Sequence, residues 1–183
     1  MRKIFCLFVF GCLFVSGGTF AAFVNFETPQ VHPIDLSPDG TTILVTNTAA
    51  GFLDIYDATS GTPVPRGSVQ VGIDPVSVRF RTNAEAWVVN HVSDSVSVVH
   101  IPTQRVIATI ATLDEPCDVA FAGSPERAFV SCSQVNTIQR FDPADLAAAP
   151  TNIPIVAEEP RALAVSPDGL TVYAAIFESG NGS

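Results

Sequence analysis

A repeat of just over 40 residues is the feature that most constrains the fold of this chain. Each unit begins with an alternating apolar run, a polar turn and a second alternating run. Four segments align in this way: 31–47, 75–90, 116–132 and 160–176. Their matched apolar positions Leu36, Phe80, Phe121 and Val165 lie 44, 41 and 44 residues apart. Alternation with period two indicates β-strands, and a fixed period of this length indicates similar structural units.

The second half of each unit supplies two further strands. A third run reads GFLDIY, DSVSVV or NTIQRF, and a weaker fourth run lies at 67–71, 106–110 and 152–156. Pro-Asp-Gly turns join the first and second runs at 38–40 and 167–169. Four short strands in a unit of this length are typical of β-propeller blades. The sequence therefore predicts an all-β fold, a β-propeller of four-stranded antiparallel blades, in preference to a β-sandwich or a β-solenoid.

The units divide the chain into about three and a half blades. The expected blades are 31–73, 74–114, 115–159 and an incomplete 160–183. Propellers close with roughly four to eight blades, so we expect a larger ring whose remaining blades come from a C-terminal continuation of the same chain. Residues 22–30 form an N-terminal segment, and 23–27 is a candidate closing strand.

The first 21 residues have the layout of a secretory signal peptide. Arg2 and Lys3 precede an apolar run at 4–15, and small residues lead to a cleavage position after Ala21. The apolar run is short of the ~20 residues of a membrane-spanning helix, which disfavours a stable transmembrane anchor. A lipoprotein attached through Cys12 is the weaker alternative. We therefore expect an exported protein that is periplasmic, secreted or on the cell surface.

The charge of the mature chain excludes one class of partner. Cleavage after residue 21 leaves seven arginines against eighteen acidic residues, a net charge of −11. Such a chain repels the phosphate backbone, so nucleic acid is not an expected partner.

The repeats also resemble a known family. Val-Thr-Asn at 45–47 and Val-Val-Asn at 88–90 are each followed by a turn and then by LDIYD or VSVVH, with SPDG upstream and VIATI downstream. These motifs resemble the YVTN family of β-propeller repeats. The resemblance covers roughly residues 30–176 and implies an exported or surface-layer protein related to lactonase-like and nitrite-reductase haem propellers. Cys132 and Ile176 replace the motif asparagine in the later units, so this asparagine is not a ligand required in every blade.

The candidate ligand site is the face that carries the loops between second and third strands and the loops between blades. We expect an acidic rim there: Asp74, Asp94, Asp114, Glu115, Glu158, Glu159 and Glu178, with His91 and Arg161. Solvated turn residues are the alternative interpretation. No spacing indicates a resident metal, haem or nucleophile elbow, so no cofactor is predicted, although the rim suits a cation such as calcium.

Two cysteines remain after the predicted cleavage, Cys117 and Cys132. A turn centred near Ser124-Pro125 sets them directly opposite each other on paired strands. They are a candidate disulfide, and two buried free thiols are the alternative.

Two functions from different classes follow. The first is a non-catalytic binding or surface scaffold whose acidic face meets a protein, a glycan or a cation. The alternative is the propeller part of a lactonase-like or nitrite-reductase-like enzyme whose active site lies mostly beyond residue 183. The absence of a recurring catalytic constellation in the repeats favours the first.

Overall fold

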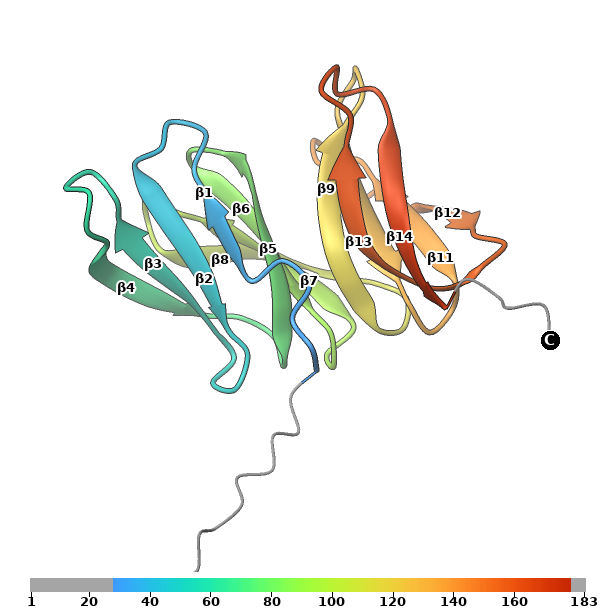
Figure 1. Ribbon diagram of the computed structural model, residues 1–183, viewed down its shortest axis with the longest axis horizontal. Coiled ribbons are helices and arrows are strands. Elements are labelled where there is room, and N and C mark those ends of the chain that lie inside the picture. Colours follow the sequence, from blue (N-terminus) through green and yellow to red (C-terminus); the bar gives the residue numbers. More distant parts are fainter. Residues whose placement is uncertain (1–27, 179–183) are drawn as a thin grey trace, which may run out of the picture.

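The computed structural model describes residues 28–178 of the 183-residue chain, so the predicted signal peptide (1–21) and closing strand (23–27) lie outside the described residues. The described part contains three four-stranded antiparallel sheets and one two-stranded sheet (Figure 1). Their strands are β1 (Ile34–Leu36), β2 (Thr42–Asn47), β3 (Phe52–Asp57), β4 (Val64–Gln70), β5 (Pro75–Thr82), β6 (Glu85–Asn90), β7 (Ser95–His100), β8 (Arg105–Ala111), β9 (Pro116–Ala122), β10 (Arg127–Cys132), β11 (Thr137–Phe141), β12 (Thr151–Pro154), β13 (Glu158–Val165) and β14 (Val172–Glu178).

The strand order confirms the predicted architecture. Within each sheet the strands pair in chain order, as β1-β2-β3-β4, β5-β6-β7-β8 and β9-β10-β11-β12, while β13 pairs with β14. The first strands of successive sheets lie next to one another: β5 contacts both β1 and β9, and β9 contacts β13. A parallel bridge between His32 and Ser77 joins the first two sheets on this side. Sheets that meet through their first strands are the blades of a β-propeller, three of them complete and the fourth represented by two strands.

The hydrophobic core lies between the blades. Alternate residues of each strand point to opposite faces of its sheet, so a blade can pack against a neighbour on each face. Among the described residues the second and third blades each pack against two neighbours, and the first blade packs against the second. Between the first two blades, Leu53 and Ile55 meet Val88 and Val99, all of them at most 1% exposed. Trp87 is fully buried between the second and third blades and makes an edge-to-face contact with Phe121, with ring centroids 5.4 Å apart.

An irregularity recurs where a new blade begins. An acidic residue with positive φ precedes a proline at Asp74 (60°), Glu115 (54°) and Glu159 (55°). In β5 and β9 the residue after that proline, Val76 or Cys117, is skipped in the pairing with the second strand. This β-bulge bends the first strand as it enters the blade.

Two strand boundaries differ from the sequence prediction. The fourth strand of the first blade is Val64–Gln70, three residues earlier than the predicted start at 67, because Pro65 pairs with Tyr56 across a bulge. Strand β13 begins at Glu158, inside the range predicted for the third blade. Glu158 and Glu159 therefore belong to the first strand of the fourth blade, and their assignment to a loop was wrong.

The Pro-Asp-Gly segments form turns. The Asp39 carboxylate accepts hydrogen bonds from Ser37 Oγ at 2.6 Å and from the Thr41 amide at 3.0 Å, which hold the pKa of Asp39 below its usual value. Asp168 makes the matching bonds with Ser166 and Leu170, and its pKa is lowered for the same reason. In the part of the chain described by the structure, no helix is long and apolar enough to span a membrane.

Candidate functional site on the loop-bearing face

The structure brings together the two kinds of loop that the sequence assigned to one face. The His91 amide, after the second strand of its blade, donates to the Asp74 carbonyl at 2.9 Å. The Ser133 amide donates to the Glu115 carbonyl at 3.0 Å in the corresponding place of the third blade. The loops between second and third strands therefore contact the loops that lead into a blade.

Asp94 serves as an anchor for its turn. It has a positive φ of 46°, its carbonyl accepts the Thr112 amide at 2.9 Å, and its carboxylate accepts the Glu115 amide at 3.0 Å. Asn136 makes the same two contacts one blade later, with the Ile155 and Glu159 amides. An amide side chain replaces the carboxylate without loss of the contacts, so the acidity of Asp94 is not needed for the turn.

His91 makes a contact between blades. The residue is 7% exposed, and its Nδ1–H donates to the Pro116 carbonyl at 3.1 Å. Thr48, the matching residue of the first blade, donates through Oγ1 to the Pro75 carbonyl at 2.8 Å. His91 Nε2 lies 4.0 Å from a carboxylate oxygen of Glu115. The imidazole thus takes the place of a threonine hydroxyl in joining the second blade to the third.

We expect His91→Thr to retain most of the stability that His91→Ala loses. Alanine leaves the Pro116 carbonyl without its donor, at a cost of about 1–3 kcal/mol in the free energy of unfolding. Threonine supplies the hydroxyl that performs this task at Thr48. Chemical denaturation followed by circular dichroism measures both variants. Equal loss in both would show that the imidazole stabilises by its volume and not by this hydrogen bond.

The remaining rim residues differ in whether their carboxylates form hydrogen bonds or ion pairs. Asp74 is 8% exposed, and its carboxylate accepts the Thr28 amide at 3.4 Å. Glu115 accepts the Ser133 hydroxyl at 3.1 Å, and Glu159 pairs with Arg161 at 3.2 Å. Within the described residues, the exposed rim side chains without a hydrogen-bond partner are those of Asp114 and Glu158. Glu178 ends β14, and its side chain lies outside the described part.

Cys117 and Cys132 are buried free thiols. The predicted pairing holds as far as Ser131, which faces Asp118, but the bulge then sets Cys132 opposite Pro116. Direct opposition of the two cysteines was therefore wrong. Burial raises the pKa of both thiols, that of Cys132 to about 12. Protonated, desolvated thiols are poor nucleophiles and poor metal ligands at neutral pH.

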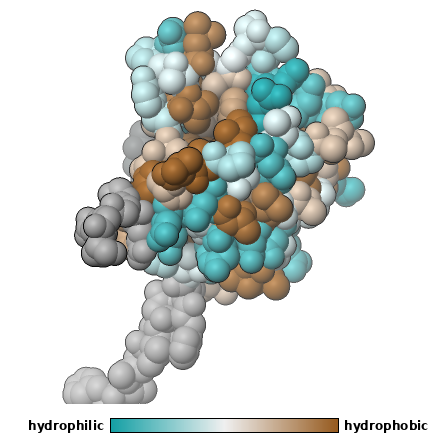
Figure 2. All heavy atoms as spheres, turned by 90° about the vertical axis from the view of Figure 1, so that its right-hand side faces the viewer, coloured by the Kyte–Doolittle hydropathy of each residue, from teal (hydrophilic) through white to brown (hydrophobic). Residues whose placement is uncertain are grey.

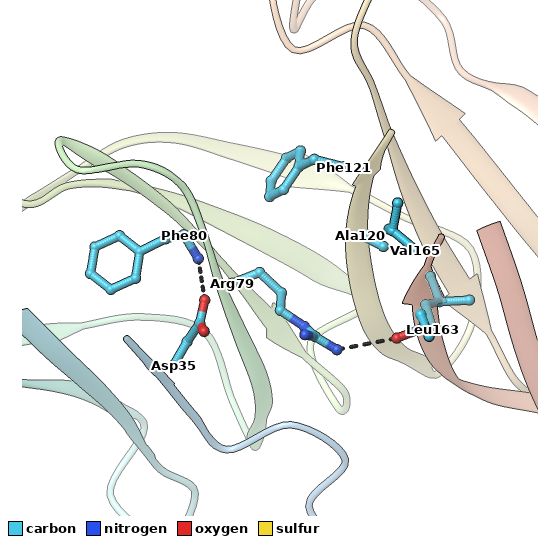
Figure 3. A pocket seen from close by; sticks show the side chains of 8 residues that line it. Asp35, Arg79, Phe80, Ala120, Phe121, Leu163 and Val165 are labelled. Atoms are coloured by element: carbon cyan, nitrogen blue, oxygen red, sulfur yellow. Dashed lines mark hydrogen bonds between the residues drawn. The ribbon is translucent and has the colours of Figure 1, made fainter. Parts of the chain in front are cut away.

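A charged network that was not predicted from the sequence lies between the first strands. Asp118 is fully buried, and its carboxylate accepts Ser77 Oγ at 2.5 Å, Arg79 Nη2 at 3.1 Å and the Leu163 amide at 2.9 Å. The Arg79 guanidinium also donates to the Leu163 carbonyl at 3.2 Å, so it reaches from the second blade to the fourth (Figure 3). Asp35 makes a simpler contact of this kind by accepting the Phe80 amide at 2.7 Å.

This network borders a cavity of about 350 Å³ between the first strands (Figure 3). Its lining combines two charged side chains, Asp35 and Arg79, with apolar side chains such as Phe121 and Val165. The signal in the sequence was a lone aspartate inside the apolar run PCDVAF, since a carboxylate in a buried strand requires partners. Over residues 28–178, no group of three or more His, Cys, Asp and Glu side chains could hold a metal ion.

Comparison with solved structures agrees with this architecture. Hydrazine synthase of Kuenenia stuttgartiensis superposes with a TM-score of 0.74 and 28% identity over 90% of this chain. A candidate 6-phosphogluconolactonase of Bacteroides uniformis gives 0.67 and 21% over 81%, and virginiamycin B lyase of Staphylococcus aureus gives 0.65 and 14% over 79%. No family model matches the chain, and no curated protein sequence matches it.

These likenesses define the class as β-propeller, a fold shared by proteins with different activities. The chain is thus similar in structure to β-propeller proteins, and the finer resemblance to YVTN repeats stays a prediction. The chain spans about half the length of the matched structures, which it covers to 47%, 48% and 48%.

Proposed function

We propose that this chain is part of an exported β-propeller that acts as a binding scaffold and meets a cation or a positively charged partner surface through its acidic loop face. We define the acidic loop face by six residues: Asp74, Asp94, Asp114, Glu115, Glu158 and Glu159. One arginine, Arg161, accompanies them. The observation that carries the proposal is the exposure of Asp114 and Glu158 beside carboxylates that the turns already hold in place.

The charge balance supports attraction of cations. Carboxylates that gather on one face of a chain with net charge −9 produce a negative potential, which raises the local concentration of positive ligands. The engaged members, such as Asp94 and Glu115, have fixed positions because they bond to backbone or hydroxyl groups. Asp114 and Glu158 remain available for a ligand. Calcium is one candidate, since its preferred ligands are oxygens, and a lysine-rich protein surface is another.

A binding experiment tests the proposal. Asp114→Asn combined with Glu158→Gln removes two negative charges and keeps the side-chain shapes, and we expect about 3- to 10-fold weaker binding of an oligolysine peptide. Asp145→Asn is the control for a negative charge removed elsewhere, because the exposed Asp145 lies in the loop between β11 and β12, at the opposite end of the strands. Isothermal titration with oligolysine and with calcium, at two salt concentrations, provides the affinities. Equal affinity for variant and control, or binding that salt does not weaken, would contradict the proposal.

The likeness to hydrazine synthase favours a second candidate, because it extends over 90% of this chain at 28% identity. In this candidate the blades belong to an enzyme of redox or lactonase-like kind whose reacting groups lie outside residues 28–178. An optical spectrum and a lactone hydrolysis assay on the product of the whole coding sequence distinguish the two candidates. Haem absorption or lactone turnover favours the enzyme, and cation-dependent binding without either favours the scaffold.

A further inference from the structure

An apolar groove remains open between the third blade and the two strands of the fourth. Its volume is about 360 Å³, and Ile138, Ile153, Leu163, Val172 and Ala174 are among its lining residues. Apolar side chains are visible on the side of the molecule that carries the last two sheets (Figure 2). Among the described residues, the groove therefore lies beyond the last complete blade, between it and the two strands β13 and β14.

The two earlier interfaces show which groups fill this position. Ile153 pairs with Ile138 as Val69 pairs with Leu53 and as Ile110 pairs with Val96. Yet Val69 is 5% exposed and Ile110 is 8% exposed, whereas Ile153 is 37% exposed.

Ile153 is more exposed than Val69 and Ile110 because, over residues 28–178, its interface has fewer strands from the following blade. At the first interface the third and fourth strands of the following blade provide Val99 and Val106, and at the second interface the third strand provides Phe141. The fourth blade has its first strand, with Leu163, and its second strand, with Val172 and Ala174, in place. Its third and fourth strands are what the groove lacks in the described part of the chain.

One edge of β14 also has no paired strand among the described residues. Strands β2, β6 and β10 each pair with a first strand on one side and a third strand on the other. Among the described residues β14 pairs with β13 alone. A free edge accepts an added strand through backbone hydrogen bonds, and alternate side chains of that strand then point onto the neighbouring sheet.

We propose that the groove and the β14 edge together receive the third and fourth strands of a fourth blade, from a polypeptide segment that continues the repeat after β14. The third strand pairs antiparallel with β14 and turns an apolar side chain, equivalent to Val99 or Phe141, toward Ile138. The fourth strand provides the partner equivalent to Val106. The matched propeller structures are about twice as long as this chain, which supports a continuation as the source.

A second copy of this chain fits the position less well. Its third strands β3, β7 and β11 are each paired on both sides, so none can be donated without unfolding its own blade. A second β14 could pair edge to edge, but it would bring no third-strand side chain over Ile138.

A chimera built from the chain itself tests the proposal. Residues 1–180 are joined to a second copy of 95–112, the third and fourth strands of the second blade with their flanking residue. We expect amide exchange in β14 to slow about tenfold or more relative to the unextended chain, because fraying edge amides become paired. We also expect a higher midpoint of thermal unfolding and weaker binding of a hydrophobic dye. The matched control carries Val99→Asp and Val106→Asp in the grafted copy alone, and it should show none of these changes.

Two results would overturn the inference. The first is the same exchange rate in β14 with and without the graft, or equal protection by the graft and its aspartate control. The second is concentration-dependent protection of β14 in the unextended chain, which would identify a second copy as the occupant. Neither result depends on the acidic loop face, so the inference and the proposed function can fail separately.

Discussion

Replacement of Asp118 by alanine is expected to lower the free energy of unfolding by about 3–5 kcal/mol, the usual cost of removing one partner of a buried ion pair. The carboxylate is fully buried and joins three blades through Ser77, Arg79 and Leu163. Without it, Arg79 keeps a positive charge on a side chain only 27% exposed, and the Leu163 amide loses its acceptor. Urea denaturation followed by circular dichroism measures the change.

Two further variants separate the effect of the Asp118 charge from that of a hydrogen bond between blades. Asp118→Asn keeps an acceptor oxygen for the Leu163 amide and should cost less than alanine. Asp35→Ala is the matched control, because Asp35 also binds an amide of the next blade but is 25% exposed, and we expect a loss of only about 1–3 kcal/mol. If Asp118→Ala were no more costly than Asp35→Ala, the network would not be the principal link between these blades.

The blade architecture could be predicted because local sequence patterns indicate it. Alternation, turn residues and a repeat near 40 residues are properties of short windows, and together they specify four strands per unit in chain order. The boundaries were less predictable. The residue after each blade-opening proline is skipped by a β-bulge, and nothing in the alternation of PCDVAF reveals the slip. This is why Cys117 and Cys132 look directly opposed in the sequence and are not in the structure.

The contacts of the candidate site were harder to predict from the sequence than the blade architecture. The repeat predicts that the loop residues His91 and Asp94 share a face with the loops between blades, but it does not predict which groups they contact. The partner of His91 is the Pro116 carbonyl, 25 residues away in the next blade, and a contact between neighbouring blades depends on how the blades stack. Comparison of His91 with Thr48 could have suggested a shared role, since both occupy the same position of the repeat. His91 thus joins its blade to the next one through an imidazole N–H, whereas Thr48 makes the equivalent contact through a hydroxyl.

Trp87→Ala is expected to lower the free energy of unfolding by about 3–5 kcal/mol, the usual cost of removing a fully buried large aromatic side chain. The indole is 0% exposed between the second and third blades and meets the Phe121 ring edge to face, with an interplanar angle of 89°. Its Nε1–H donates to Glu85 at 3.0 Å. Alanine would leave a cavity at the interface and remove the aromatic contact together with this hydrogen bond. Far-ultraviolet circular dichroism monitors unfolding, since the variant lacks the chain's single tryptophan.

The repeat itself offers the controls for this variant. Phe129 and Leu44 occupy the place of Trp87 in the third and first blades, so Trp87→Phe and Trp87→Leu introduce side chains that the same position already accepts. We expect Trp87→Phe to lose least, because it retains an aromatic ring near Phe121, and Trp87→Leu to fall between phenylalanine and alanine. Equal losses in all three variants would mean that the indole hydrogen bond to Glu85, and not the filling of the interface, accounts for the stability of this junction.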